Sequence, residues 1–279
     1  MGLLAGQFAA LLWHEPITAA SGADVSYISR HDAVRDSRPA VKCLAADARL
    51  EETYRRVLQG ERAALLLTDP PYCLLTRRRK GGDLREKRRG VKIDRDPVVR
   101  FEDVRAYRRF TAEWLPAAAA HVDGPLVVWT NFLGKEPIRS AARELGYREA
   151  GEFLWAKRTS ERDGNELLLR VYETALVFLK EPLSELRPQD VQRAWCVAAA
   201  YDDEGEAAKW GNHPNHKPFS VLEPLVRQWS RPGDLVLDPF AGSGSIPAAA
   251  LRLQRRVACS EIEPEWAGRV SRRLSEVHP

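Results

Sequence analysis

The chain has 279 residues, of which 44% are hydrophobic and 29% are charged. This length suits one globular domain with insertions and is too short for two domains of comfortable size. The four cysteines (Cys43, Cys73, Cys196 and Cys259) are far apart and form no Cys-x-x-Cys pair. That spacing argues against a zinc site or a disulfide framework, and it favours a reducing cytoplasm.

The first 40 residues match no pattern that we can place, and we assign them no role. Residues 2–13 are apolar enough to suggest a signal peptide, but no Lys or Arg precedes them. The run is also too short to span a bilayer. We interpret it as a helix that packs on the domain, and we expect no membrane partner.

From residue 41 to residue 279, strand-like and helical patterns alternate, which predicts a doubly wound α/β sheet. Two consecutive strand runs have no convincing helix between them and are expected to form an antiparallel pair at one sheet edge, namely 151–157 and 173–179. Trp129 and Trp155 are expected in the core. The other strand runs are 43–47, 64–69, 125–131, 234–240 and 255–261, and the helical runs are 49–59, 101–121, 134–146, 217–230, 244–253 and 263–276.

Two segments interrupt the alternation. Residues 74–100 contain glycines and many charges with little apolar periodicity, and are predicted to form a loop. Residues 181–212 also lack periodicity.

The basic charge of the chain is concentrated in the first of these segments. The net charge of the whole chain is +4, whereas residues 77–95 carry ten basic and three acidic side chains, or +7. A run of this kind is either solvated surface or a contact to the phosphate backbone of a nucleic acid. We expect phosphate contacts from Arg77, Arg78, Arg79, Lys80, Arg85, Lys87, Arg88, Arg89 and Lys92.

Two short motifs carry the chemistry, and each follows an apolar run that is typical of a buried parallel strand. The first is Asp69-Pro70-Pro71-Tyr72, and the second is Asp238-Pro239-Phe240-Ala241-Gly242-Ser243-Gly244. Open α/β sheets bind ligands at the carboxyl ends of such strands. Position 247 is Pro, so the dinucleotide pattern Gly-x-Gly-x-x-Gly is absent.

These motifs resemble those of the amino DNA methyltransferases, which methylate adenine N6 or cytosine N4. The second motif resembles their S-adenosylmethionine loop, and the first resembles the loop that holds the amino group of a base. The order in this chain, with the amino-binding motif first, is similar to that of the β-class. The resemblance implies a class I S-adenosylmethionine-dependent methyltransferase fold with a mostly parallel seven-stranded sheet, helices on both faces and a circularly permuted order.

The resemblance extends to three further segments, from about Val41 to Trp266. It implies that Asp47 meets the cofactor adenine, that Glu261 meets its ribose, and that the segment from His213 to Pro218 lies on its methionine side, with Lys217 pairing with the cofactor carboxylate. The cofactor-binding residues expected are Asp47, His213, Lys217, Pro218, Asp238, Pro239, Phe240, Ala241, Gly242, Ser243, Gly244 and Glu261. It also makes the segment 181–212 a short candidate for target recognition.

Each of these residues also has a purely structural interpretation. The motif at Asp69 could be a simple turn, Asp47 could cap helix 49–59, Glu261 could cap the helix that begins near Glu263, and Lys217 could be solvated. The chain also departs from the family pattern, because Cys73 stands where Asn is common and His216 stands where Gln is common.

The motif Asp69-Pro70-Pro71-Tyr72 suits an aromatic amine because it offers hydrogen-bond acceptors. The lone pair of such an amine is delocalised into the ring, and acceptors for its two hydrogens draw the nitrogen towards a tetrahedral geometry. The Asp69 carboxylate and the Pro70 carbonyl can each accept one amine hydrogen, Pro70 and Pro71 fix the backbone, and Tyr72 offers a face for the base. We therefore predict methyl transfer to the amino group of a base flipped out of duplex DNA. Within the family, Asp at the first motif position favours adenine N6. Cytosine N4 and, more remotely, an RNA base remain alternatives.

The expected cofactor is S-adenosylmethionine, and no metal is expected. The expected partner is double-stranded DNA, with a second copy of the chain and a cognate restriction nuclease as open candidates. The predicted localisation is the cytoplasm, in association with the nucleoid.

Overall fold

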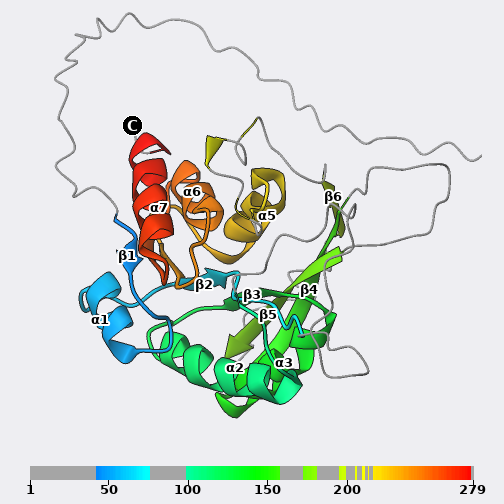
Figure 1. Ribbon diagram of the computed structural model, residues 1–279. Coiled ribbons are helices and arrows are strands. Elements are labelled where there is room, and N and C mark those ends of the chain that lie inside the picture. Colours follow the sequence, from blue (N-terminus) through cyan, green and yellow to red (C-terminus); the bar gives the residue numbers. More distant parts are fainter. Residues whose placement is uncertain are drawn as a thin grey trace, which may run out of the picture. The chain divides into compact units, whose positions relative to one another are not determined.

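A mostly parallel sheet lies between two layers of helices in the computed structural model (Figure 1). The structure describes residues 42–75, 99–157, 172–180, 195–198, 205, 209–210, 213 and 216–277. Its sheet has the strand order β1-β8-β7-β2-β3-β5-β4-β6 within those ranges. The strands are β1 (Leu44–Ala45), β2 (Leu65–Thr68), β3 (Leu126–Thr130), β4 (Tyr147–Lys157), β5 (Tyr172–Lys180), β6 (Trp195–Ala198), β7 (Leu235–Asp238) and β8 (Arg256–Glu261).

The pairings confirm the predicted fold class. Neighbouring strands from β1 to β3 are all parallel. β5 pairs antiparallel with β3 and with β4, and β4 pairs parallel with β6, so β5 alone opposes the other strands described. The prediction of seven strands was one short, because β6 forms inside segment 181–212, where no periodicity marks a strand. The antiparallel β4–β5 pair was predicted correctly, but β6 lies outside it at that edge.

Helices cover the sheet on both faces, as predicted. α1 (Glu51–Leu58), α2 (Val104–Ala119) and α3 (Lys135–Glu144) lie on one face, and α5 (Phe219–Trp229), α6 (Ser245–Arg252) and α7 (Pro264–Val277) lie on the other (Figure 1). A short 3₁₀ helix, η1 (Phe132–Gly134), precedes α3. Each of the six predicted helical runs overlaps one of these α-helices, with the ends of run and helix within three residues of each other.

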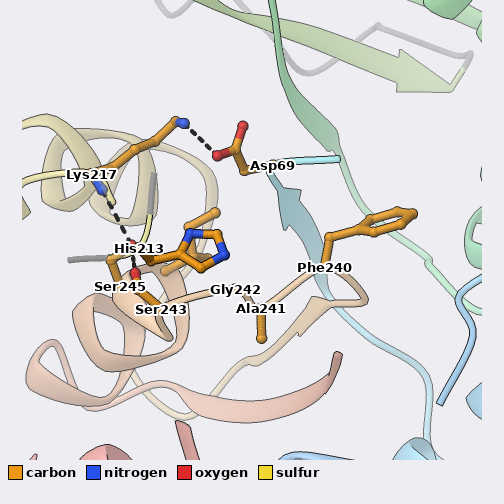
Figure 2. Close-up of a pocket in the computed structure, with 9 residues that line it drawn as sticks. Asp69, His213, Lys217, Phe240, Ala241, Gly242, Ser243 and Ser245 are labelled. Atoms are coloured by element: carbon orange, nitrogen blue, oxygen red, sulfur yellow. Dashed lines mark hydrogen bonds and ion pairs between the residues drawn. The ribbon is translucent and has the colours of Figure 1, made fainter. Parts of the chain in front are cut away.

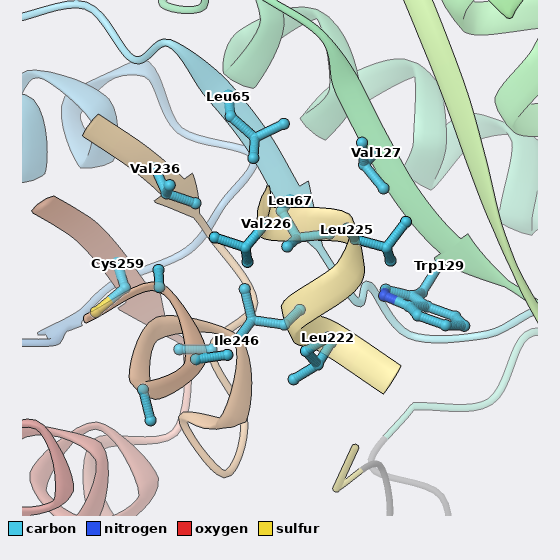
Figure 3. Packing of buried hydrophobic residues seen from close by; sticks show 14 of the residues in the cluster. Leu65, Leu67, Val127, Trp129, Leu222, Leu225, Val226, Val236, Ile246 and Cys259 are labelled. Atoms are coloured by element: carbon cyan, nitrogen blue, oxygen red, sulfur yellow. The ribbon is translucent and has the colours of Figure 1, made fainter. Parts of the chain in front are cut away.

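The alternation of side chains along β2 explains why both faces are covered. Leu65 and Leu67 point into the core beneath α5, α6 and α7, together with Val127, Trp129 and Val236 (Figure 3). The intervening Leu66 packs in the second core, against α1, α2 and α3. A strand whose residues are all buried on alternating faces requires cover on both sides.

Trp129 and Trp155 are fully buried, with 0% and 1% exposure, which confirms their predicted place in the core. None of the helices that the structure describes combines the length and apolar character needed to cross a lipid bilayer.

The permuted order places the two motif-bearing strands side by side. β2 pairs directly with β7, although they are far apart in sequence. The Thr68 hydroxyl donates to Oδ1 of Asp238 at 2.7 Å across the two strand ends. Both motifs therefore begin at the same edge of the sheet.

Several predictions lie outside the described residues. They concern residues 1–40, most of segment 181–212, and the basic residues Arg77, Arg78, Arg79, Lys80, Arg85, Lys87, Arg88, Arg89 and Lys92.

Candidate active site

The loop after β2 presents a buried carboxylate, Asp69, with 9% exposure. Its Oδ2 lies 2.5 Å from the ammonium of Lys217 (Figure 2). Its Oδ1 is buried and has no hydrogen-bond partner. Because a buried carboxylate oxygen without a donor is unfavourable, Oδ1 is suited to accept a hydrogen from a ligand.

Burial raises the pKa of the Asp69 carboxyl, and the positive charge of Lys217 opposes that rise. Burial also lowers the pKa of the Lys217 ammonium, but Asp69 and Glu173 outweigh this effect, so that the pKa is raised overall. The lysine is therefore charged at neutral pH.

The loop after β7 lines the same two cavities as Asp69. Gly242 has a φ of +52°, and a Cβ there would lie 2.9 Å from Cε1 of His213. Gly244 has a φ of +77° at the start of α6. These are conformations that glycine adopts readily, so the loop can approach a ligand with its main chain.

His213 faces this loop (Figure 2). Burial, together with the charge of Lys217, lowers the pKa of His213 to about 4. The imidazole is therefore neutral at pH 7, and its ring packs edge-on against Trp266 at a centroid distance of 4.6 Å.

Glu261, at the end of β8, is fixed by two backbone amides. Its Oε2 accepts from the Gly242 amide at 2.9 Å, and its Oε1 accepts from the Glu263 amide at 3.1 Å. The Glu263 amide lies before α7, which begins at Pro264, so the second bond closes a local turn and is not the N-cap bond of the alternative interpretation. One side chain thus joins the ends of β7 and β8.

Asp47 does not cap α1. The N-cap of that helix is Leu50, without a side-chain hydrogen bond. The Asp47 carboxylate instead pairs with Arg49 at 2.6 Å, and hydrogen bonds from Arg49 lower its pKa.

A cavity of about 420 Å³ connects these elements. Its walls come from the segment after β1, the loop after β2, the segment 99–101 with part of α2, His213, and the ends of β7 and β8. Asp47, Asp69, Tyr72, Phe240, Gly242 and Glu261 all line it. A smaller cavity beside it is shared by Asp69, His213, Lys217 and the Phe240–Ser243 loop. The acceptor carboxylate and the glycine loop therefore open into one connected space.

Comparison with known proteins identifies this arrangement. The sequence profile of the N6/N4 methyltransferase family, described as DNA methylase, matches residues 63–269. The match covers most of the chain and includes both motifs. The chain belongs to the N6/N4 DNA methylase family. Its members transfer a methyl group from S-adenosylmethionine to an amino group of adenine or cytosine.

One curated relative agrees with this assignment, and two solved structures share the fold. The type II methyltransferase M.HinfI of Haemophilus influenzae is 25% identical over 244 residues, which are 80% of this chain and 66% of that protein. The crystal structure of the M1.HpyAVI–SAM complex has a TM-score of 0.56 at 20% identity and covers 84% of this chain and 98% of that one. The cytosine-N4-specific PvuII DNA methyltransferase has a TM-score of 0.54 at 17% identity, over 79% and 86% of the two chains.

The lining of the large cavity fits the cofactor of this family. Glu261 offers a carboxylate of the kind that accepts from ribose hydroxyls, and Phe240 and Ile262 offer apolar surface for an adenine. Gly242 leaves no room for a side chain, so its backbone can meet the methionine portion. The individual roles of Asp47, Pro239, Ala241, Ser243 and the other predicted cofactor residues stay predictions.

Two carboxylates of the protein balance the charge of Lys217, namely Asp69 at 2.5 Å and Glu173 at 3.0 Å. The contact of Lys217 with the cofactor carboxylate stays a prediction. Lys217 is not the solvated lysine of the alternative interpretation, since its side chain is only 1% exposed.

The departure at Cys73 has a structural counterpart in Asn131. The Asn131 amide donates to the Cys73 carbonyl at 3.1 Å and accepts from the Gly134 amide at 3.0 Å. An asparagine from the end of β3 thus supports the backbone of the Asp69 loop.

Sequence reasoning missed Glu173, the second residue of β5. Its carboxylate accepts from the Tyr72 hydroxyl at 2.8 Å and faces Lys217. The available signal was a single acidic residue in a strand that is otherwise rich in apolar side chains.

Proposed function

We propose that this methyltransferase modifies the N6 amino group of adenine in duplex DNA, with Asp69 as the principal acceptor for the amine. Two observations carry the proposal: Oδ1 of Asp69 is buried without a hydrogen-bond partner, and the Asp69 residue lines two cavities that the glycine loop also lines. The aspartate at the first motif position is the feature that favours adenine over cytosine.

S-adenosylmethionine, when bound, supplies an electrophilic methyl group. Asp69 Oδ1 accepts one hydrogen of the target amine, and the Pro70 carbonyl accepts the other. These two bonds draw the nitrogen lone pair out of conjugation with the ring, towards the incoming methyl carbon. Because the acceptors are fixed before the base arrives, their stabilisation falls mainly on the transition state. The nitrogen becomes cationic as the new bond forms, so its proton leaves readily and no strong base is needed.

In this proposal the base reaches Asp69 by flipping out of the duplex, and Tyr72 provides a surface for stacking. The basic residues of segment 77–95 contact the phosphates on either side. A second copy of the chain and a cognate nuclease remain candidate partners from the sequence prediction.

The test is to express the chain in a host whose DNA carries neither N6-methyladenine nor N4-methylcytosine, digest the DNA to nucleosides and separate them by mass. We expect N6-methyladenine alone. The matched control is the Asp69→Asn variant, whose DNA should contain far less of either modified base.

Recovery of N4-methylcytosine without N6-methyladenine would overturn the choice of base and leave the role of Asp69 intact. Modified nucleosides found only in the RNA fraction would overturn the choice of DNA.

A further inference from the structure

Glu173 places a second carboxylate beside the Lys217 ammonium that also pairs with Asp69. It lies on β5, opposite Trp155 of β4, and is 8% exposed. Its Oε2 is 2.8 Å from the Tyr72 hydroxyl and 3.0 Å from the Lys217 ammonium. Isolated burial of a carboxylate is strongly unfavourable. Glu173 therefore belongs to a buried charge cluster that also contains Asp69, Tyr72 and Lys217.

The hydrogen bonds of the Lys217 ammonium are fully used in this cluster. An ammonium has three donors, and the structure gives it three acceptors: Asp69 Oδ2 at 2.5 Å, Glu173 Oε2 at 3.0 Å and the Tyr72 hydroxyl at 3.1 Å. No donor of the lysine is left for the second oxygen of Asp69. The Tyr72 hydroxyl, in turn, uses its own hydrogen on Glu173.

We propose that Glu173 is a positioning residue for methyl transfer. It holds Lys217 and Tyr72 in place, so that Oδ1 of Asp69 stays free for the target amine. Its negative charge keeps Asp69 a strong hydrogen-bond acceptor. Without Glu173, Lys217 would regain a donor and could move onto both oxygens of Asp69. The lysine would then compete with the amine for the acceptor that the reaction needs.

The charge of Glu173 has a separate effect from its position. Among the described residues, Lys217 faces two carboxylates, so its positive charge does not act on Asp69 alone. Burial raises the pKa of Asp69, Lys217 lowers it, and Glu173 raises it again. In the part of the chain that the structure describes, the titratable groups around Asp69 come from the loop after β2, from α2, from β5, from β7 and from the segment before α5. They are Tyr72, Tyr107, Glu173, Asp238, His213 and Lys217.

The decisive variant is Glu173→Gln, which keeps the shape of the side chain and an oxygen for the Tyr72 hydroxyl but removes the charge. We expect the dissociation constant for S-adenosylmethionine to change by less than about threefold, and kcat to fall by roughly ten- to a hundred-fold. The acidic limb of the pH profile of kcat should move to lower pH, because a cluster without this negative charge binds its proton less readily.

An unchanged kcat would overturn the proposal. A lower kcat with the acidic limb at its wild-type pH would also overturn the proposal, because that result is expected of a residue with a structural role only. The matched control is Glu152→Gln on the neighbouring β4. Glu152 is ion-paired with Lys135 and is 20% exposed, but it does not line either cavity, so the variant should behave as wild type.

Glu173→Asp separates charge from reach and serves as the test if the glutamine variant does not fold. The shorter side chain keeps its negative charge but loses the contact with the Tyr72 hydroxyl. We expect a lower kcat with the acidic limb at its wild-type position. A limb that moves to lower pH in this variant, or a wild-type kcat, would contradict the proposal.

Discussion

Asp69→Asn tests the acceptor geometry directly, since an amide has the shape of a carboxylate but only one acceptor oxygen. In the structure Oδ2 of Asp69 is engaged by Lys217 and Oδ1 is free. If the amide oxygen stays on Lys217, its NH₂ group faces the target amine, and two donors meet. If the amide is reversed, the NH₂ group faces the ammonium instead.

Either orientation removes one charge-assisted hydrogen bond and leaves one conflicting pair of donors. A hydrogen bond to a charged group is worth about 1.5–3 kcal/mol, and a buried group left unsatisfied costs about 1–3 kcal/mol. We take about 3–4 kcal/mol as the loss of transition-state stabilisation, which corresponds to a fall in kcat of roughly 10²- to 10³-fold.

The assay is single-turnover methyl transfer to DNA with labelled S-adenosylmethionine, with cofactor affinity measured separately by calorimetry. We expect the loss in kcat and a nearly unchanged dissociation constant. The control is Asp123→Asn, an exposed aspartate that pairs with Arg62 at the surface. Turnover within about threefold of wild type would refute the acceptor role, and an equal loss of cofactor affinity would assign the carboxylate to the cofactor instead.

Two other predictions follow from the same site, and a third follows from the basic segment 77–95. Gly242→Trp should abolish S-adenosylmethionine binding in calorimetry without unfolding the sheet. The control is Gly60→Trp, also at positive φ but in open space, which should bind the cofactor normally. Normal binding by Gly242→Trp would contradict the cofactor assignment. Burial raises the pKa of Asp238 from 3.8 to about 7, so the folded chain keeps a proton that the unfolded chain releases between these pH values. The free energy of unfolding should therefore fall as the pH rises from about 4 to about 7, by up to about 4 kcal/mol. Denaturant unfolding of Asp238→Asn should therefore show a weaker decline than wild type between pH 4 and 7, and parallel curves would argue against this linkage. Neutralising five arginines should make the plot of log affinity for DNA against log salt concentration less steep, by roughly 0.9 for each lost phosphate contact. An unchanged slope would mean that the segment is solvated surface. The five arginines are Arg77, Arg78, Arg79, Arg88 and Arg89.

The sequence alone determined the class of the fold and the two loops that carry the chemistry. Each of the described strands and helices that it predicted depends on a local pattern, such as the apolar run Leu65–Leu67 or the amphipathic helix 263–276. The motif at Asp69 and the glycines after Asp238 are also local, because a few consecutive residues fix the backbone of each loop. Burial of Trp129 followed from its place on a central strand.

The tertiary structure alone decided which side chains meet Asp69. Lys217 is 148 residues from Asp69 in the chain, and Tyr72 is 101 residues from Glu173. These contacts exist because β5 inserts between β3 and β4 and because the segment before α5 reaches Asp69 at the end of β2. A local pattern records the face on which a residue lies but not the strand that will become its neighbour, so the partner of a buried charge is fixed only when the sheet order is fixed.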